Sequence, residues 1–170
     1  MGDHAAGLIL TMSHGIRPLP DGGYGVRLEP EERELLRRLA AELEQLVASE
    51  DVAVARLFPS AYRDDPRAEQ EYRRLVRGTL VSGRLEALRM LQARAGSDRL
   101  TQKEADAWCG ALNDLRLVLG ERIGVTQELY DHGVDPDDPK AVELSIYGWL
   151  TWLQATLVDA LAQVGPSGLT

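Results

Sequence analysis

The chain has 170 residues, and its 27 acidic against 19 basic side chains leave a formal net charge of −8 at pH 7. So acidic a chain repels phosphate at long range, which disfavours nucleic-acid binding. A lone cysteine excludes an internal disulfide and indicates a reducing compartment, and no apolar run approaches the roughly 18 residues of a membrane span. We therefore expect a cytoplasmic protein that makes no membrane contact.

The predicted elements begin after a flexible N-terminal segment, residues 1–20. The Asp-Gly-Gly of residues 21–23 predicts a turn, and the alternation over residues 24–28 predicts a short strand, in a β arm or hairpin. Four main helices follow, over about residues 30–47, 66–95, 102–123 and 139–163. We expect one helical domain over residues 21–164 and a tail, 165–170.

Residues at the ends of these segments support the helix boundaries. Pro30 suits the first position of a helix, and Asp65 precedes a proline at the start of the second. Thr101 and Glu104 have the spacing of a capping box, and Gly124 is typical of a helix end. The sequence therefore predicts a mostly α protein, a bundle of four main helices with a short N-terminal β arm or hairpin.

The fourth helix is apolar almost all round, with Gly148 near its middle. Two explanations stay open: the helix is central in the bundle, or it forms the interface of a homodimer. The candidate interface residues are the large aromatic side chains Tyr147, Trp149 and Trp152.

Polar residues interrupt the apolar third helix at Asn113, Asp114 and Arg116. We interpret them as a partly buried network that fixes how the helices pack, in which Asp114 pairs with an arginine of the second helix. A catalytic acid or a small-anion pocket is the alternative, and it is weakened because no histidine or second acid is evident nearby. The predicted structural polar cluster consists of Asp64, Asp65, Arg84, Asn113, Asp114 and Arg116.

Cys109 lies seven positions before Arg116, on the same side of the helix, and a nearby guanidinium would lower its pKa and favour redox reactivity. The alternative is a small buried cysteine beside Trp108. The three histidines have no metal-ligand spacing, and the acidic loop at residues 131–138 does not match a calcium-binding loop, so no metal or cofactor is expected.

Arg73, Arg74 and Arg77 make the second helix locally basic. They are the candidate contacts for nucleic acid or for a partner protein. Aromatic residues are sparse there and no helix-turn-helix spacing is evident, which favours a solvated face that pairs with acids of the same bundle.

Two stretches carry a resemblance to a known family: "RLFPSAYRDDPRAEQEYRRLVRGTL" at residues 56–80 and "AWCGALNDLRLVLGERIGV" at residues 107–125. They resemble the actinobacterial domain-of-unknown-function family twenty-seventeen, over about residues 24–163. The residues that carry the pattern are Pro59, Tyr62, Asp64, Asp65, Arg84, Asn113, Asp114, Arg116, Leu119 and Gly120.

This resemblance implies a family without an established enzyme activity, some of whose relatives are described as redox-responsive transcriptional regulators that use a cysteine pair. Cys109 is alone here, so a disulfide switch within the chain is impossible. We expect a non-enzymatic regulatory or interaction protein whose partner is another protein or a second copy in a homodimer. The alternatives are a stress-linked regulator that binds DNA through the second helix, and a small-molecule site or enzyme at Asp114.

Overall fold

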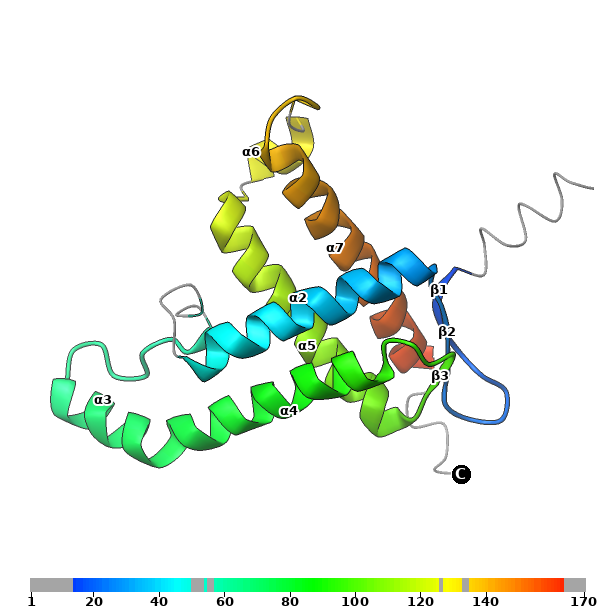
Figure 1. Cartoon of the computed structure of the whole chain (residues 1–170). Helices are drawn as coiled ribbons and strands as arrows, with labels where there is room; N and C mark the ends of the chain where they lie inside the picture. Colours follow the sequence, from blue (N-terminus) through cyan, green and yellow to red (C-terminus); the bar gives the residue numbers. More distant parts are fainter. Residues whose placement is uncertain (1–13, 50–53, 55–56, 126, 133–134, 164–170) are drawn as a thin grey trace, which may run out of the picture.

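The computed structural model describes residues 14–49, 54, 57–125, 127–132 and 135–163. Four long helices form the body (Figure 1): α2 (Pro30–Ala48), α4 (Gly78–Arg94), α5 (Gln102–Ile123) and α7 (Lys140–Gln163). The shorter elements are β1 (Gly15–Pro18), β2 (Tyr24–Arg27), α3 (Pro66–Tyr72), the π-helical turn η2 (Arg73–Arg77), β3 (Arg99–Leu100) and α6 (Gln127–His132). The predicted fold class, a helical bundle with a small β element, is confirmed.

The predicted helix starts are confirmed, with one difference in detail. Pro30 is the first residue of α2, and the hydroxyl of Thr101 accepts a hydrogen bond from the backbone N–H of Glu104. The other half of the expected capping box is not formed, because the Glu104 carboxylate binds Arg94 at 2.6 Å instead. Gly124 ends α5 with φ +64°, a left-handed conformation that glycine adopts without strain.

The second predicted helix is built of three consecutive parts, α3, η2 and α4. The turn from Arg73 to Arg77 is wider than an α-helical turn. The pattern of apolar residues does not reveal this turn, because neither α3 nor η2 buries a residue and so no apolar stripe runs through it.

The strands form an antiparallel sheet in the order β1-β2-β3, which confirms the expected hairpin and adds a third strand. Strand β1 lies in the segment expected to be flexible, and β3 has only two residues, too few to show alternation. The outer edge of β1 is covered by α7, since Ile16 donates its backbone N–H to the Thr156 hydroxyl at 3.2 Å and Pro18 has no N–H to offer.

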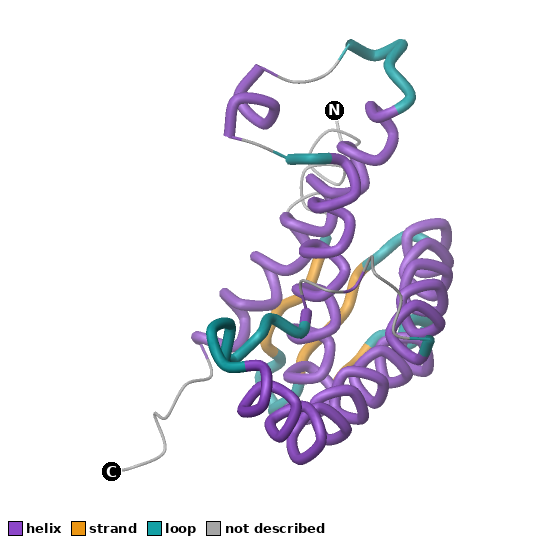
Figure 2. Tube along the Cα trace, turned by 90° about the vertical axis from the view of Figure 1, so that its left-hand side faces the viewer, coloured by secondary structure: helices purple, strands orange, loops and turns teal. Residues whose placement is uncertain are grey.

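The apolar core lies where α5 packs against α4 and α7, and where α2 crosses them (Figure 1). Its fully buried members include Leu36, Leu88, Leu91, Trp108, Leu112, Leu150, Leu153 and Leu157. Figure 2 shows the strands in the lower body, among the helices, and α6 at the opposite end. No helix among the described residues has the length and apolar character needed to cross a membrane.

Two segments extend beyond this core. Neither α3 nor η2 has a buried residue, and the buried residues of α4 begin only at Leu88. Residues 66–80 therefore form an arm that points away from the other helices (Figure 1). The first turns of α7 and the unpredicted helix α6 make a second projection, since the buried residues of α7 begin at Leu150.

Candidate functional site

The arm displays apolar side chains on a projecting helix. Leu75, Val76 and Leu80 are exposed, Leu75 by 65%. A small hollow of about 70 Å³ lies beside them, between Phe58, Tyr72 and other residues of the arm. Large apolar side chains gathered on one projecting surface are typical of a protein-binding site.

Two of the arginines of the arm form ion pairs within the arm itself. Arg73 binds Glu69 at 3.2 Å and Arg74 binds Glu71 at 2.7 Å. The Arg77 guanidinium lies over the Phe58 ring, 5.5 Å from its centre. The structure therefore places the three predicted contact residues on one element, and two of them already face carboxylates.

Asp114 is buried, with 4% of the residue exposed, and it binds Arg84 of α4, an arginine of the predicted second helix. Arg84 also donates to the backbone carbonyl of Leu57 at 3.1 Å and lies over the Phe58 ring. Burial raises the pKa of Asp114, and the Arg84 hydrogen bond and charge oppose that rise. This pair ties α5 to α4 and to the chain that precedes the arm.

The other members of the predicted polar cluster do not join this pair. Arg116 turns toward α7, where it donates to Thr151 at 3.1 Å and to Gln154. Asn113 is exposed. The interpretation of Asn113, Asp114 and Arg116 as members of one network is wrong, because each helical step of about 100° sends neighbouring residues to different faces.

Asp64 and Asp65, the two acids before the arm, also do not belong to the polar cluster that was predicted for them. Asp65 caps α3, since its carboxylate accepts hydrogen bonds from the backbone N–H groups of Arg67 and Ala68, both at 3.1 Å. Asp64 is exposed. No ion pair with an arginine side chain is found for either acid among the described residues.

Cys109 is half-buried on α5, and burial raises the pKa of its thiol. A hydrogen bond from Gln154 lowers that pKa, and the negative charge of Asp106 raises it. The predicted activation by Arg116 is wrong: its guanidinium is bound to Thr151 and Gln154 on α7, and the groups that shift the pKa of the thiol are Gln154 and Asp106. This environment favours the protonated thiol at neutral pH.

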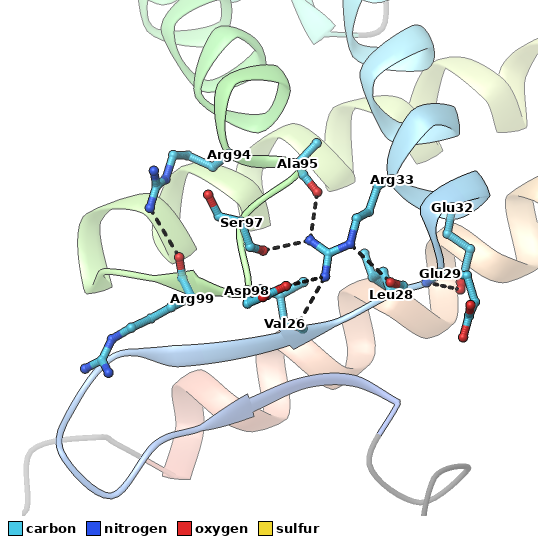
Figure 3. Close-up of polar contacts among 10 residues, drawn as sticks. All are labelled: Val26, Leu28, Glu29, Glu32, Arg33, Arg94, Ala95, Ser97, Asp98 and Arg99. Carbon is cyan, nitrogen blue, oxygen red and sulfur yellow. Dashed lines mark hydrogen bonds and ion pairs between the residues drawn. The ribbon is translucent and has the colours of Figure 1, made fainter.

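The Arg33 side chain holds several segments of the chain together, a role that the sequence does not predict. Figure 3 shows its guanidinium between the sheet and the turn that follows α4. It donates to the backbone carbonyls of Leu28, Ala95, Ser97 and Val26, at 2.8 to 3.3 Å, and pairs with Asp98 at 3.0 Å. Four of the five acceptors are backbone atoms, which no residue pattern reveals.

The three aromatic residues predicted at a dimer interface differ in their surroundings. Trp149 donates its indole N–H to Glu32 of α2 at 2.6 Å, and Tyr147 lies against Gly120 of α5. Trp152 is exposed on one side and makes an edge contact with His14, with ring centres 5.0 Å apart. Tyr147 and Trp149 therefore contribute to packing within the chain, and Trp152 remains at the surface.

A wider hollow of about 700 Å³ runs along the hairpin, between Arg17, Arg27, Arg33 and Asp98. It is distant in sequence from Asp114. His14 also lines this hollow, and its ring nitrogen Nε2 lies 2.9 Å from a carboxylate oxygen of Glu32. Within the described ranges, no three His, Cys, Asp or Glu side chains are grouped so that they could hold a metal ion.

Comparison with known proteins identifies the family. A family model described as "Domain of unknown function (DUF2017)" matches residues 13–161. This chain belongs to that family. The resemblance stated from the two motif stretches is confirmed.

Curated relatives of this DUF2017 member come from mycobacteria. The "Putative oxidative stress regulator AosR" of Mycobacterium leprae is 32% identical, over 66% of this chain and 59% of the relative. The "Oxidative stress regulator AosR" of Mycobacterium bovis and that of Mycobacterium tuberculosis are each 32% identical, over 65% of this chain and 58% of theirs. The chain thus spans less than two thirds of the length of these relatives. No solved structure matches it.

Proposed function

We propose that this chain is a regulatory protein of the oxidative stress response that acts by binding another protein through its arm, and that it is not an enzyme. The relatives support the regulatory part, because their names describe regulators of oxidative stress. The exposed apolar surface of Leu75, Val76 and Leu80 supports the mode of action, and it is the observation that carries the proposal.

The shape of the arm also favours a partner. Its helices gain little from packing within the chain, because α3 and η2 bury no side chain. A π turn such as η2 occurs frequently at functional sites. A projecting helix with apolar anchors suits a groove on another protein.

DNA binding through Arg73, Arg74 and Arg77 is the second candidate. Local pairing with Glu69 and Glu71 reduces the positive charge that the arm offers to phosphate. A small-molecule site or an enzyme at Asp114 is less well supported, because that carboxylate is buried and bound to Arg84.

The test compares two exposed apolar positions. Leu75→Asp changes the arm, and Val142→Asp is a matched control on α7, where Val142 is 68% exposed. Each variant replaces the deleted gene in its own host, and transcripts are measured after peroxide treatment. We expect Val142→Asp to restore the wild-type response and Leu75→Asp to fail although it folds normally.

Equal restoration by both variants would contradict the proposal. A gel shift at low salt distinguishes the DNA alternative. Binding to the neighbouring promoter that is lost in Arg73→Glu/Arg74→Glu, but kept in Leu75→Asp, would place DNA instead of protein on the arm.

A further inference from the structure

The hollow along the hairpin has an excess of positive charge, although the chain as a whole carries a net charge of −8. Its charged lining residues, besides His14, are Arg17, Arg27, Arg33, Glu29 and Asp98. Asp98 is paired with Arg33 at 3.0 Å, and His14 is held by Glu32. Glu29 lies at the N-terminus of α2, where the helix dipole offsets part of its charge. Three arginines thus face two acids that already have positive neighbours, and this excess attracts an anion.

Arg17 supplies a charge that nothing in the described part of the chain balances. Its side chain is exposed, and it forms no ion pair or side-chain hydrogen bond with any described residue. Arg99 of the same sheet is occupied, since it binds Asp21 at 2.9 Å and the backbone carbonyl of Gly22 at 2.7 Å. A guanidinium without a partner on the wall of a hollow offers its N–H donors to a ligand.

The register of the hairpin places a second arginine on the same face. Arg17 of β1 is opposite Gly25 of β2, and Arg27 comes two residues after Gly25, so both side chains stand on one face of the sheet. Diagonal neighbours of this kind lie about 7–8 Å apart. Like charges so placed repel each other, and an anion between them removes that cost.

Gly25 keeps the space between the two arginines open. A Cβ at this position would come within 3.1 Å of the Leu19 side chain and within 3.7 Å of Cγ of Arg17. Leu19 therefore lies over the backbone of Gly25, and it gives the hollow an apolar wall beside the two charges.

The size and the lining of the hollow indicate the class of ligand. Its volume of about 700 Å³ is typical of sites for small organic molecules. A guanidinium binds the two oxygens of a carboxylate or a phosphate through parallel N–H groups. The acidic chain repels a long polyanion, whereas a small anion needs to meet only the local excess of positive charge.

We propose that the hollow along the hairpin binds a small organic anion, a phosphate ester or a carboxylate with a compact apolar body. Arg17 binds the anionic group, Arg27 stands on its other side, and the apolar body lies against Leu19. This site is on other elements than the arm and does not depend on the function proposed for the arm.

Heteronuclear NMR of the full chain at fixed ionic strength tests the proposal. The probes are phenyl phosphate, benzoate and benzyl alcohol, which share a ring and differ in charge. We expect at least one of the two anions to shift the Gly25 amide and the Arg17 side-chain signals, with a dissociation constant of about 1 mM. The tighter anion identifies the class, phosphate ester or carboxylate, and benzyl alcohol should shift neither signal.

A pair of variants with the same net charge separates a site from general attraction of anions. Arg17→Gln should weaken the binding of the tighter anion at least about tenfold. The control is Arg63→Gln, which also removes an exposed arginine but precedes α3, at the opposite end of the molecule from the hairpin (Figure 1). It should change the constant by less than about twofold. Equal effects of the two variants, or no shift with either anion at about 10 mM, would overturn the proposal.

Discussion

The Asp114 carboxylate is buried against Arg84, so its protonation and the stability of the fold are linked. Burial raises the pKa of Asp114, which means that the folded state holds this proton more tightly than the unfolded state. The stability that this carboxyl group contributes therefore falls as the pH rises through its folded pKa.

Arg84→Met keeps an apolar contact with Phe58 and removes the cation. We expect the free energy of unfolding to fall by about 3 kcal/mol at about pH 7.5, and by less at about pH 5, where Asp114 can take up a proton. Urea denaturation at both pH values measures the difference. The control is Arg89→Met in the exposed pair with Glu44, for which we expect less than about 1 kcal/mol. Equal losses for the two variants would contradict this account.

Cys109 should react slowly in the folded protein, because burial raises the pKa of its thiol and limits access to it. We expect iodoacetamide to alkylate it at least about tenfold more slowly than in the urea-unfolded chain at the same pH. Mass spectrometry over time gives both rates. Gln154→Ala should slow the reaction further, since the Gln154 hydrogen bond favours the thiolate. Native alkylation as fast as in the unfolded chain would indicate an activated thiol.

Arg33→Lys tests the hydrogen bonds that the Arg33 guanidinium makes to backbone carbonyl groups of the sheet and of the turn after α4. Lysine keeps the charge but cannot reach four carbonyl groups in the planar geometry of a guanidinium. We expect a loss of about 2–3 kcal/mol in the free energy of unfolding, measured by urea denaturation. Arg37→Lys, one turn along α2 at an exposed pair with Glu34, is the control and should change little. A similar small effect at Arg33 would show that its hydrogen bonds are replaceable.

At the scale of the elements, the helices of the body and those of the arm should differ in how they depend on their caps. Thr101 begins α5, which is central in the core, whereas Asp65 begins α3, which buries no side chain. Loss of a cap on α5 must therefore affect the whole fold, and loss of the cap on α3 only the arm.

Thr101→Ala should lower the free energy of unfolding by about 1 kcal/mol. Asp65→Ala should leave the urea midpoint nearly unchanged and speed amide hydrogen exchange over residues 66–77. Exchange measured by mass spectrometry on both variants separates the two effects. If Asp65→Ala lowered the midpoint as much as Thr101→Ala, the arm would belong to the cooperative core.

The elements that the sequence predicts are those with local signals. Thr101 and Gly124 mark the two ends of α5, and the glycines of the turn at residues 21–23 mark the hairpin. The missed elements lack such signals: β3 has two residues and α6 has six. The pairing of Asp114 with an arginine of the second helix could be predicted, because the second and third helices are both long and are neighbours in the predicted bundle.

The sequence pattern does not predict contacts between residues that are far apart along the chain. Glu32 and Trp149 are 117 positions apart, and Arg33 binds carbonyl groups that any residue could supply. The predicted cluster at Asn113, Asp114 and Arg116 is wrong, because residues that are adjacent along a helix point in different directions. Arg116 lies about 200° around the helix axis from Asp114.

On the scale of the whole molecule, two uncovered surfaces lie on different elements. The arm presents Leu75 and Leu80, and the outward face of α7 presents Trp152 and Val158.

The most direct measurement is photo-crosslinking in the living host, with benzoylphenylalanine in place of Leu75 or, as a control, of Val142. The account predicts a covalent product at Leu75 that contains a second, different protein, and no such product at Val142. The same products at both positions, or crosslinks from Leu75 only to DNA, would contradict it.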